Sequence, residues 1–295
     1  MNAYRPFPLV FKVLGFSALA FLVLGVLPAF LLPGGLPAGI WKNGAASLLA
    51  QRPGLAIFSQ CVLLAVAFLA LAFFRGVLDR DGAGLLPDGG RAALRQGLWG
   101  AGVGTAMVFL LLAASFALGA FRFRVNPQGW SALPLFAVFF LLAALKEEIF
   151  FRWYALKLMA EEMQPWKALA ASVFLVSLFH RPGGGVSVLS VANLLLLGVL
   201  LGLVYLHFKS IWAAVGLHFA WGFLQALAFG VETGNGAAKG LLIPIHLGQP
   251  GWVSGGSVGI EGPILATLIF VGAIGWIFFS MKPALVKAEE VEAAA

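Results

Sequence analysis

The sequence predicts an all-α protein, a polytopic bundle of about eight transmembrane helices. Two observations carry this prediction. Of the 295 residues, 61% are hydrophobic and only 11% are charged, whereas a soluble domain carries roughly 25% charged residues. Several apolar runs also reach the roughly 18 to 20 residues that a helix needs to cross about 30 Å of hydrocarbon.

The apolar runs give the expected spans in order, each ending at a polar, Gly-rich or Pro-rich stretch. Their ends are placed where charged or helix-breaking residues appear. The expected spans are Val13–Leu32, Leu55–Phe74, about Gly97–Phe121, Trp130 to about Leu158, Trp166 to about His180, Val188–His207, Ile211–Gly230 and about Ile260–Met281.

These spans divide into three parts. Residues 1–125 hold three N-terminal spans, residues 126–232 hold a core of four spans, and residues 233–295 hold a loop, the last span and a tail. The Gly-rich loop Val231–Gly259 is expected to be weakly ordered, and the polar tail Lys282–Ala295 shows no fold of its own. Cys61 is the only cysteine, which excludes an internal disulfide and a thiolate metal cluster.

The basic residues predict the orientation. Although the net charge is +7, the Lys and Arg residues are scattered through short loops, as membrane orientation requires, and do not indicate nucleic acid binding. More of them fall on the side of the two termini than on the other side. We therefore expect both termini in the cytoplasm, with the chain in a cell membrane.

Charged residues interrupt the fourth apolar run in the stretch LKEEIFFRWYALKL, which begins at Leu145. A carboxylate at the centre of a bilayer costs about 3 kcal/mol and usually faces a partner or a water-filled cavity. Glu148 and Arg152 are four residues apart on one helix face and can form an ion pair, whereas Glu147 points about 100° away. The alternative is that the span ends at Leu145 and the charges cap it, but the residues after Arg152 are apolar again.

Two histidines lie in apolar runs, His180 at the end of the fifth and His218 within the seventh. Together with Glu147 they make a carboxylate–imidazole group on three helices, the kind of group that activates water. His207 and His246 lie at the end of a span and in a loop, and we assign them no role.

At these residues the sequence resembles the CAAX protease and bacteriocin-processing (CPBP, or Abi) family of intramembrane proteases. The family's motif Glu-Glu-x-x-x-Arg is present at Glu147–Arg152. The motif Phe-x-x-x-His corresponds to Val176–His180, with valine for phenylalanine, and His-x-x-x-Asn to His218–Gly222, with Gly222 for asparagine. The resemblance extends over about Leu133 to Gly230. Together with composition and topology, it suggests a bacterial cytoplasmic membrane.

The resemblance implies an intramembrane endopeptidase with Glu147, His180 and His218 as catalytic residues. Glu147 and His180 would activate water and His218 would stabilise the oxyanion, with Glu148 and Arg152 in support. Because Gly222 has no side chain, Gln225, two turns after His218, could supply the missing amide.

The sequence is compatible with a mechanism with or without a metal ion. Glu147, His180 and His218 could hold zinc with an open water position, but the pattern His-Glu-x-x-His is absent. We expect no obligatory cofactor, with zinc as the alternative. The expected partners are membrane lipid and a peptide or lipidated peptide, and nothing selects one substrate.

Two other functions fit the same residues. A transporter could use the buried glutamates and histidines as a proton or ion path, although no internal repeat supports one. Gly222 also fits an inactive family member that acts as a membrane scaffold or immunity protein.

Overall fold

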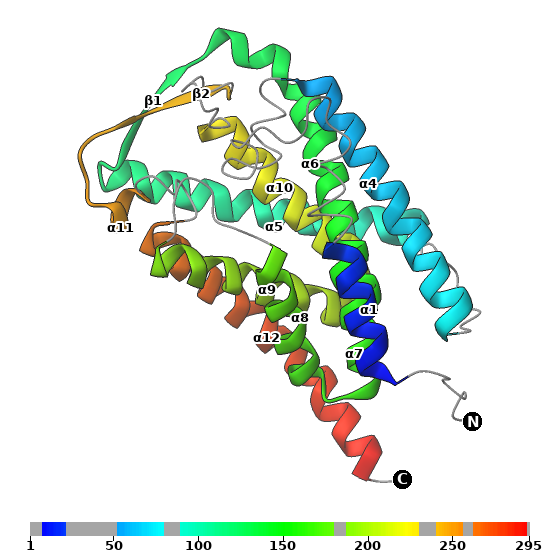
Figure 1. Ribbon diagram of the computed structural model, residues 1–295. Coiled ribbons are helices and arrows are strands. Elements are labelled where there is room, and N and C mark those ends of the chain that lie inside the picture. The colour runs from blue at the N-terminus through cyan, green and yellow to red at the C-terminus, as the bar shows by residue number, and fades with distance from the viewer. Residues whose placement is uncertain are drawn as a thin grey trace.

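The computed structural model describes residues 8–21, 52–79, 89–179, 187–229, 240–255 and 262–293. Helices dominate these segments, as predicted, and a single pair of short strands accompanies them in the part described (Figure 1). The elements are α1 Leu9–Phe21, α4 Pro53–Phe73, η2 Phe74–Asp79, α5 Gly90–Ala117, β1 Phe121–Val125, η3 Pro127–Ala132, α6 Leu133–Glu148, η4 Ile149–Leu156, α7 Lys157–Glu162, α8 Pro165–Phe179, α9 Val188–Phe208, α10 Ile211–Phe229, β2 Leu242–His246, α11 Gly251–Ser254 and α12 Ile264–Ala293.

Four of the described helices are long and apolar enough to cross a membrane, so the predicted class is confirmed. They cover Pro53–Gly76, Gly90–Ala117, Val188–Phe208 and Ile211–Ala228, and two shorter apolar helices cover Pro165–Leu178 and Ile264–Ser280. The predicted count of about eight spans is not confirmed. The first expected span, Val13–Leu32, lies partly outside the described residues, and the fourth is not one regular helix.

The fourth expected span is a continuous helical stretch whose geometry changes three times. The 3-10 helix η3 leads into α6, which ends at Glu148, and the π-helix η4 follows directly before α7. A π-helical turn inside an α-helix is rare and often marks a functional site. The change begins at the residue after the two glutamates.

Helices α5 and α10 pack closely because glycines line their contact. A Cβ atom on Gly100 would collide with the carbonyl oxygen of Ala213, and one on Gly216 with the carbonyl oxygen of Gly97. Small residues let helix backbones approach in this way in membranes. This contact fixes α10, the helix that carries His218.

The expected loop Val231–Gly259 contains regular structure where it is described. Strand β2 pairs antiparallel with β1, so that Phe121 faces His246 and Val125 faces Leu242. The short helix α11 follows. The sequence of β1, FRFRV, alternates apolar and basic residues with the period of a strand, and this pattern could have indicated it.

The C-terminal helix also departs from expectation. Helix α12 continues as regular helix to Ala293 through most of the polar tail that showed no fold of its own. Helix α1 begins and α12 ends at the same end of the molecule (Figure 1).

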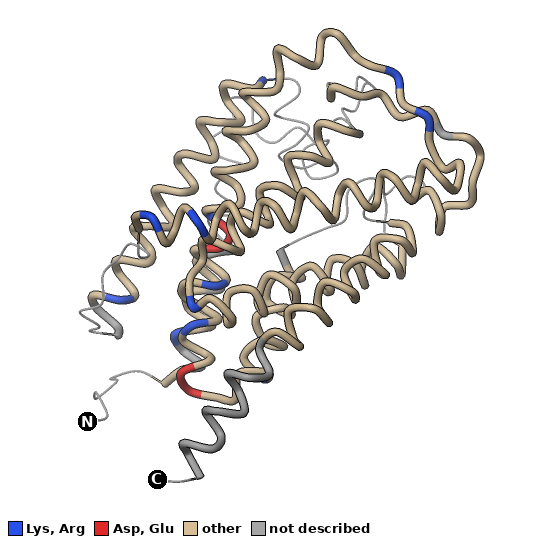
Figure 2. The backbone as a smooth tube through the Cα atoms, turned by 180° about the vertical axis from the view of Figure 1, so that it is seen from behind, with Lys and Arg blue, Asp and Glu red and all other residues tan. Residues whose placement is uncertain are grey.

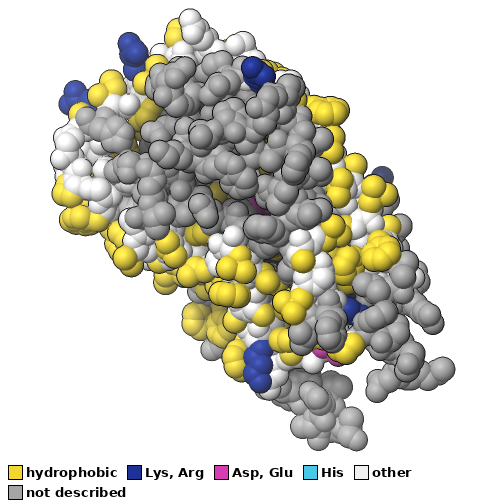
Figure 3. All heavy atoms as spheres, viewed as in Figure 1, with side chains coloured by type: hydrophobic (Ala, Val, Ile, Leu, Met, Phe, Trp, Pro, Cys, Tyr) yellow, Lys and Arg dark blue, Asp and Glu magenta, His cyan; other side chains and the backbone are white. Residues whose placement is uncertain are grey.

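The surface and the charges suit a membrane. Apolar side chains cover much of the described surface (Figure 3), and many large ones are exposed, among them Phe58, Leu69, Phe109 and Leu268. Soluble monomers rarely expose so much contiguous apolar surface. Figure 2 shows one acidic stretch among the helices in the body of the molecule, with basic positions close to it, and a second acidic stretch toward the end where the two termini lie.

Candidate active site

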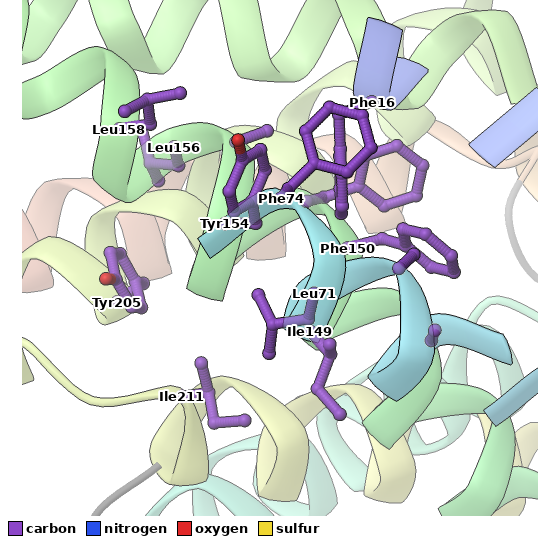
Figure 4. Close-up of a cluster of buried hydrophobic side chains, with 14 of the residues drawn as sticks. Phe16, Leu71, Phe74, Ile149, Phe150, Tyr154, Leu156, Leu158, Tyr205 and Ile211 are labelled. Carbon is purple, nitrogen blue, oxygen red and sulfur yellow. The ribbon is translucent and has the colours of Figure 1, made fainter. Parts of the chain in front are cut away.

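The π-helix η4 is anchored in an aromatic cluster (Figure 4). The ring of Phe16, on α1, lies 5.2 Å from the ring of Phe74, 5.2 Å from that of Phe150 and 4.1 Å from that of Tyr154. Offset and edge contacts of this kind add about 0.5 to 1.5 kcal/mol each beyond the burial of area. The cluster holds the backbone that presents Arg152.

Glu148 is fully buried and its charge is matched by two neighbours. Its Oε1 atom accepts a hydrogen bond of 3.0 Å from Nη1 of Arg152, four residues along as predicted, and lies 2.8 Å from Nδ1 of His218. Nη2 of Arg152 lies 3.5 Å from the carbonyl oxygen of Gly198 on α9. A buried carboxylate without such partners would be very costly, so these contacts make the position tolerable.

Glu147 lies on the other side of the same imidazole and is more accessible. Its side chain is 17% exposed, and its Oε2 atom lies 3.7 Å from Nε2 of His218. Although the two glutamates point in different directions, one ring reaches both because its two nitrogens also point apart. Glu148, whose Oε1 faces Arg152, acts as an acceptor, so Nδ1 of His218 carries a hydrogen and Nε2 faces Glu147.

A lysine and a glutamine also lie near Glu147. Nζ of Lys146 donates a 2.9 Å hydrogen bond to Oε1 of Gln60 on α4 and lies 3.8 Å from Oε1 of Glu147. Sequence reasoning assigned Gln60 no role. The available signal was a polar amide inside an apolar run, which in a membrane usually faces a partner.

The space beside Gly222 is filled by an aromatic ring. A Cβ atom at this position would lie 2.9 Å from Cδ1 and 3.2 Å from Cε1 of Phe140, on α6. The asparagine of the family motif therefore has no room here while Phe140 keeps this position. Nε2 of Gln225 is buried and makes no hydrogen bond within the described residues.

The remaining histidines lie apart from this cluster or outside the described residues. His180 directly follows α8 and lies outside them. His207 is exposed at the end of α9, with its ring against Phe208, and His246 ends β2.

No metal centre is formed by the described residues alone. Among them, no three His, Cys, Asp or Glu side chains are arranged to hold an ion. His218 and Glu147 would supply two of the three proposed zinc ligands, and His180 would be the third.

Fold and site together define a helical membrane protein with an interior cluster of two glutamates, an arginine and a histidine. Residues 128–224 match the family model described as type II CAAX prenyl endopeptidase Rce1-like, of the CPBP family. The resemblance to the CPBP family that the three motifs indicated is therefore confirmed for this segment, about a third of the chain. Searches of the curated proteins and of the solved structures gave no match.

The family match supports a hydrolase of the CAAX-type intramembrane protease class, with a peptide substrate and a membrane location. The matched segment contains Glu147, Glu148, Arg152 and His218. Gln60 lies outside it.

Proposed function

We propose that this protein is an intramembrane endopeptidase that hydrolyses a peptide bond near the membrane surface with a water molecule activated by Glu147. The observation that carries the proposal is the position of the His218 ring. Its Nδ1 is held by Glu148 at 2.8 Å, and its Nε2 faces Glu147 at 3.7 Å. A carboxylate and an imidazole at this separation can both contact one water molecule or one carbonyl group.

The two glutamates have different roles in this proposal. Glu148 is buried and occupied by Arg152 and His218, so it positions the imidazole and does not act on substrate. Glu147 is the more exposed carboxylate, and it acts as the general base. The difference in burial, 0% against 17%, supports this division.

The proposed reaction is the hydrolysis of one peptide bond by one water molecule. Glu147 takes a proton from water while the water oxygen attacks the peptide carbonyl carbon. His218 carries a hydrogen on each nitrogen in this step, and its Nε2–H donates a hydrogen bond to the oxyanion as it forms, with the proton staying on His218. The carbon–nitrogen bond then breaks, and Glu147 gives its proton to the leaving nitrogen. Each product chain is released with a new terminus.

Two parts of the proposal rest on the resemblance. His180 would share the activation of water with Glu147, and the reaction needs no metal ion, so a chelator should leave activity unchanged. Loss of activity with a chelator and its recovery with zinc would instead favour the metal alternative with Glu147, His180 and His218 as ligands.

The substrate proposed is a peptide or lipidated peptide that reaches the site from the bilayer. The distribution of basic residues supports an orientation with both termini in the cytoplasm. A bacterial cytoplasmic membrane is proposed on the composition and on the resemblance to the family.

The test compares Glu147→Gln with Glu161→Gln, a change of an exposed carboxylate on α7. Each variant is reconstituted in liposomes with a panel of lipidated peptides, and products are measured by mass spectrometry. We expect Glu147→Gln to lose turnover while it remains folded, as a cooperative unfolding transition shows, and Glu161→Gln to remain active. Full turnover by folded Glu147→Gln would overturn the proposal.

A further inference from the structure

A lysine–glutamine contact reaches the proposed general base from a helix outside the matched segment. Lys146 and Gln60 are both buried, with 6% and 3% of their surfaces exposed. Nζ of Lys146 lies 2.9 Å from Oε1 of Gln60 and 3.8 Å from Oε1 of Glu147. Glu147 therefore has a lysine near one oxygen and His218 near the other.

This lysine needs an anchor to stay beside its neighbour in sequence. Consecutive residues of an α-helix point about 100° apart, so the long side chain of Lys146 has to bend toward Glu147. Its four-carbon stem is flexible and its ammonium group has three donors and no acceptor. The amide oxygen of Gln60, on α4, takes one of these donors and limits the positions that Nζ can adopt.

The partner of Lys146 is the amide of Gln60, whose oxygen carries no charge. It can orient the ammonium group without neutralising it, so the positive charge remains available to Glu147. A carboxylate at the same place would bind the lysine more tightly and draw its charge away from Glu147. A contact that served stability alone would be strengthened by such a carboxylate.

We infer that Gln60 and Lys146 are positioning residues for the general base. Gln60 holds Lys146, and Lys146 holds Oε1 of Glu147, which leaves Oε2 facing His218. The inference rests on the proposed function. It also makes α4 part of the active-site architecture, although α4 lies outside residues 128–224.

The test uses Gln60→Leu, Gln60→Glu, Lys146→Met and Lys146→Arg in the full chain, in liposomes with the peptide panel. Ser59→Ala is the matched control, because Ser59 is also buried on α4 and, among the described residues, its hydroxyl donates to the backbone of its own helix, at Ala56. For each variant, kcat, KM and the unfolding temperature are measured separately.

We expect kcat to fall about ten- to a hundredfold in Gln60→Leu and Lys146→Met, as for a misplaced catalytic group, with KM within about twofold. Lys146→Arg should recover most of the loss. Gln60→Glu should also lower kcat in protein that remains folded, because its carboxylate competes with Glu147 for the ammonium group of Lys146. Ser59→Ala should match wild type.

The outcomes separate this inference from the proposed function. If folded Glu147→Gln keeps its turnover, the proposed function fails. If Glu147→Gln is inactive but Gln60→Glu and Lys146→Met turn over as fast as wild type, the positioning role alone is refuted.

Discussion

Replacing Gly222 by asparagine restores the family motif, yet the structure predicts that the single change destabilises the protein. The new Cβ would lie 2.9 Å from Cδ1 of Phe140, closer than Cβ atoms normally approach another atom. The amide group would add further atoms beyond it. Overpacking of this kind costs about 1 to 3 kcal/mol. Since the three atoms nearest to that Cβ all belong to the ring of Phe140, removing the ring should remove the clash.

The experiment is a double-mutant cycle with Gly222→Asn, Phe140→Ala and the combined variant, unfolded in detergent. Phe140→Ala alone loses apolar burial, but it opens the space that the introduced asparagine side chain would fill. We expect the combined variant to be more stable than the sum of the single effects by about 1 to 3 kcal/mol. Gly102→Asn is the control for the change of residue type, because a Cβ there meets nothing within 4 Å.

Turnover gives a second measurement on the same four proteins. An amide that reaches the oxyanion can raise kcat by about a hundred- to a thousandfold, so the combined variant should gain activity that Gly222→Asn alone does not. Two outcomes would show that the Phe140 ring moves aside freely. One is that the effects of the two single changes on stability simply add in the combined variant. The other is that Gly222→Asn destabilises the protein no more than the Gly102→Asn control does. The reasoning from the filled space would then be refuted.

Two further predictions concern the helix contacts and the buried ion pair. Gly216→Ala should lower the free energy of unfolding by about 1 to 3 kcal/mol, because its Cβ would collide with the backbone of α5. Gly102→Ala should leave the free energy of unfolding unchanged or raise it by up to about 1 kcal/mol, because a Cβ there meets nothing within 4 Å. Chemical unfolding in detergent measures both, and two variants of equal stability would contradict the close contact of α5 and α10. Arg152→Met should cost about 3 to 5 kcal/mol because it leaves Glu148 buried with His218 as its remaining described partner. Arg152→Lys should recover part of this loss in the same assay, and a Met variant as stable as the Lys variant would argue against an ion pair.

Local features of the sequence predicted the parts of the site that depend on spacing alone. The Glu148–Arg152 pair follows from a separation of four residues on one helix, and the structure has it at 3.0 Å. The membrane class follows from composition and the length of the apolar runs. The ion pair and the apolar runs each depend on residues that are close together in the sequence, so the sequence alone is enough to predict them.

Contacts between distant segments could not be obtained in this way. Gln60 and Lys146 are 86 residues apart, and neither segment contains a pattern that predicts contact with the other. The filling of the space at Gly222 by Phe140 depends on how α6 and α10 pack. The change to a π-helix at Ile149 likewise has no signature in the residues that we can identify.

The charges of the cluster suggest why the site tolerates its position among apolar helices. Glu147 and Glu148 carry two negative charges, and Lys146 and Arg152 carry two positive ones, so the group is neutral when His218 is neutral. Neutral clusters cost far less to bury than single ions. When His218 takes up a proton, the group gains one positive charge, with Nδ1 already committed to Glu148 and Nε2 free to donate. As water attacks, Glu147 becomes neutral and a negative oxyanion forms beside Nε2, so the net charge does not change. The negative charge moves from Glu147 to an oxygen to which Nε2–H can donate, and this interaction is made only once the carbonyl oxygen has become negative.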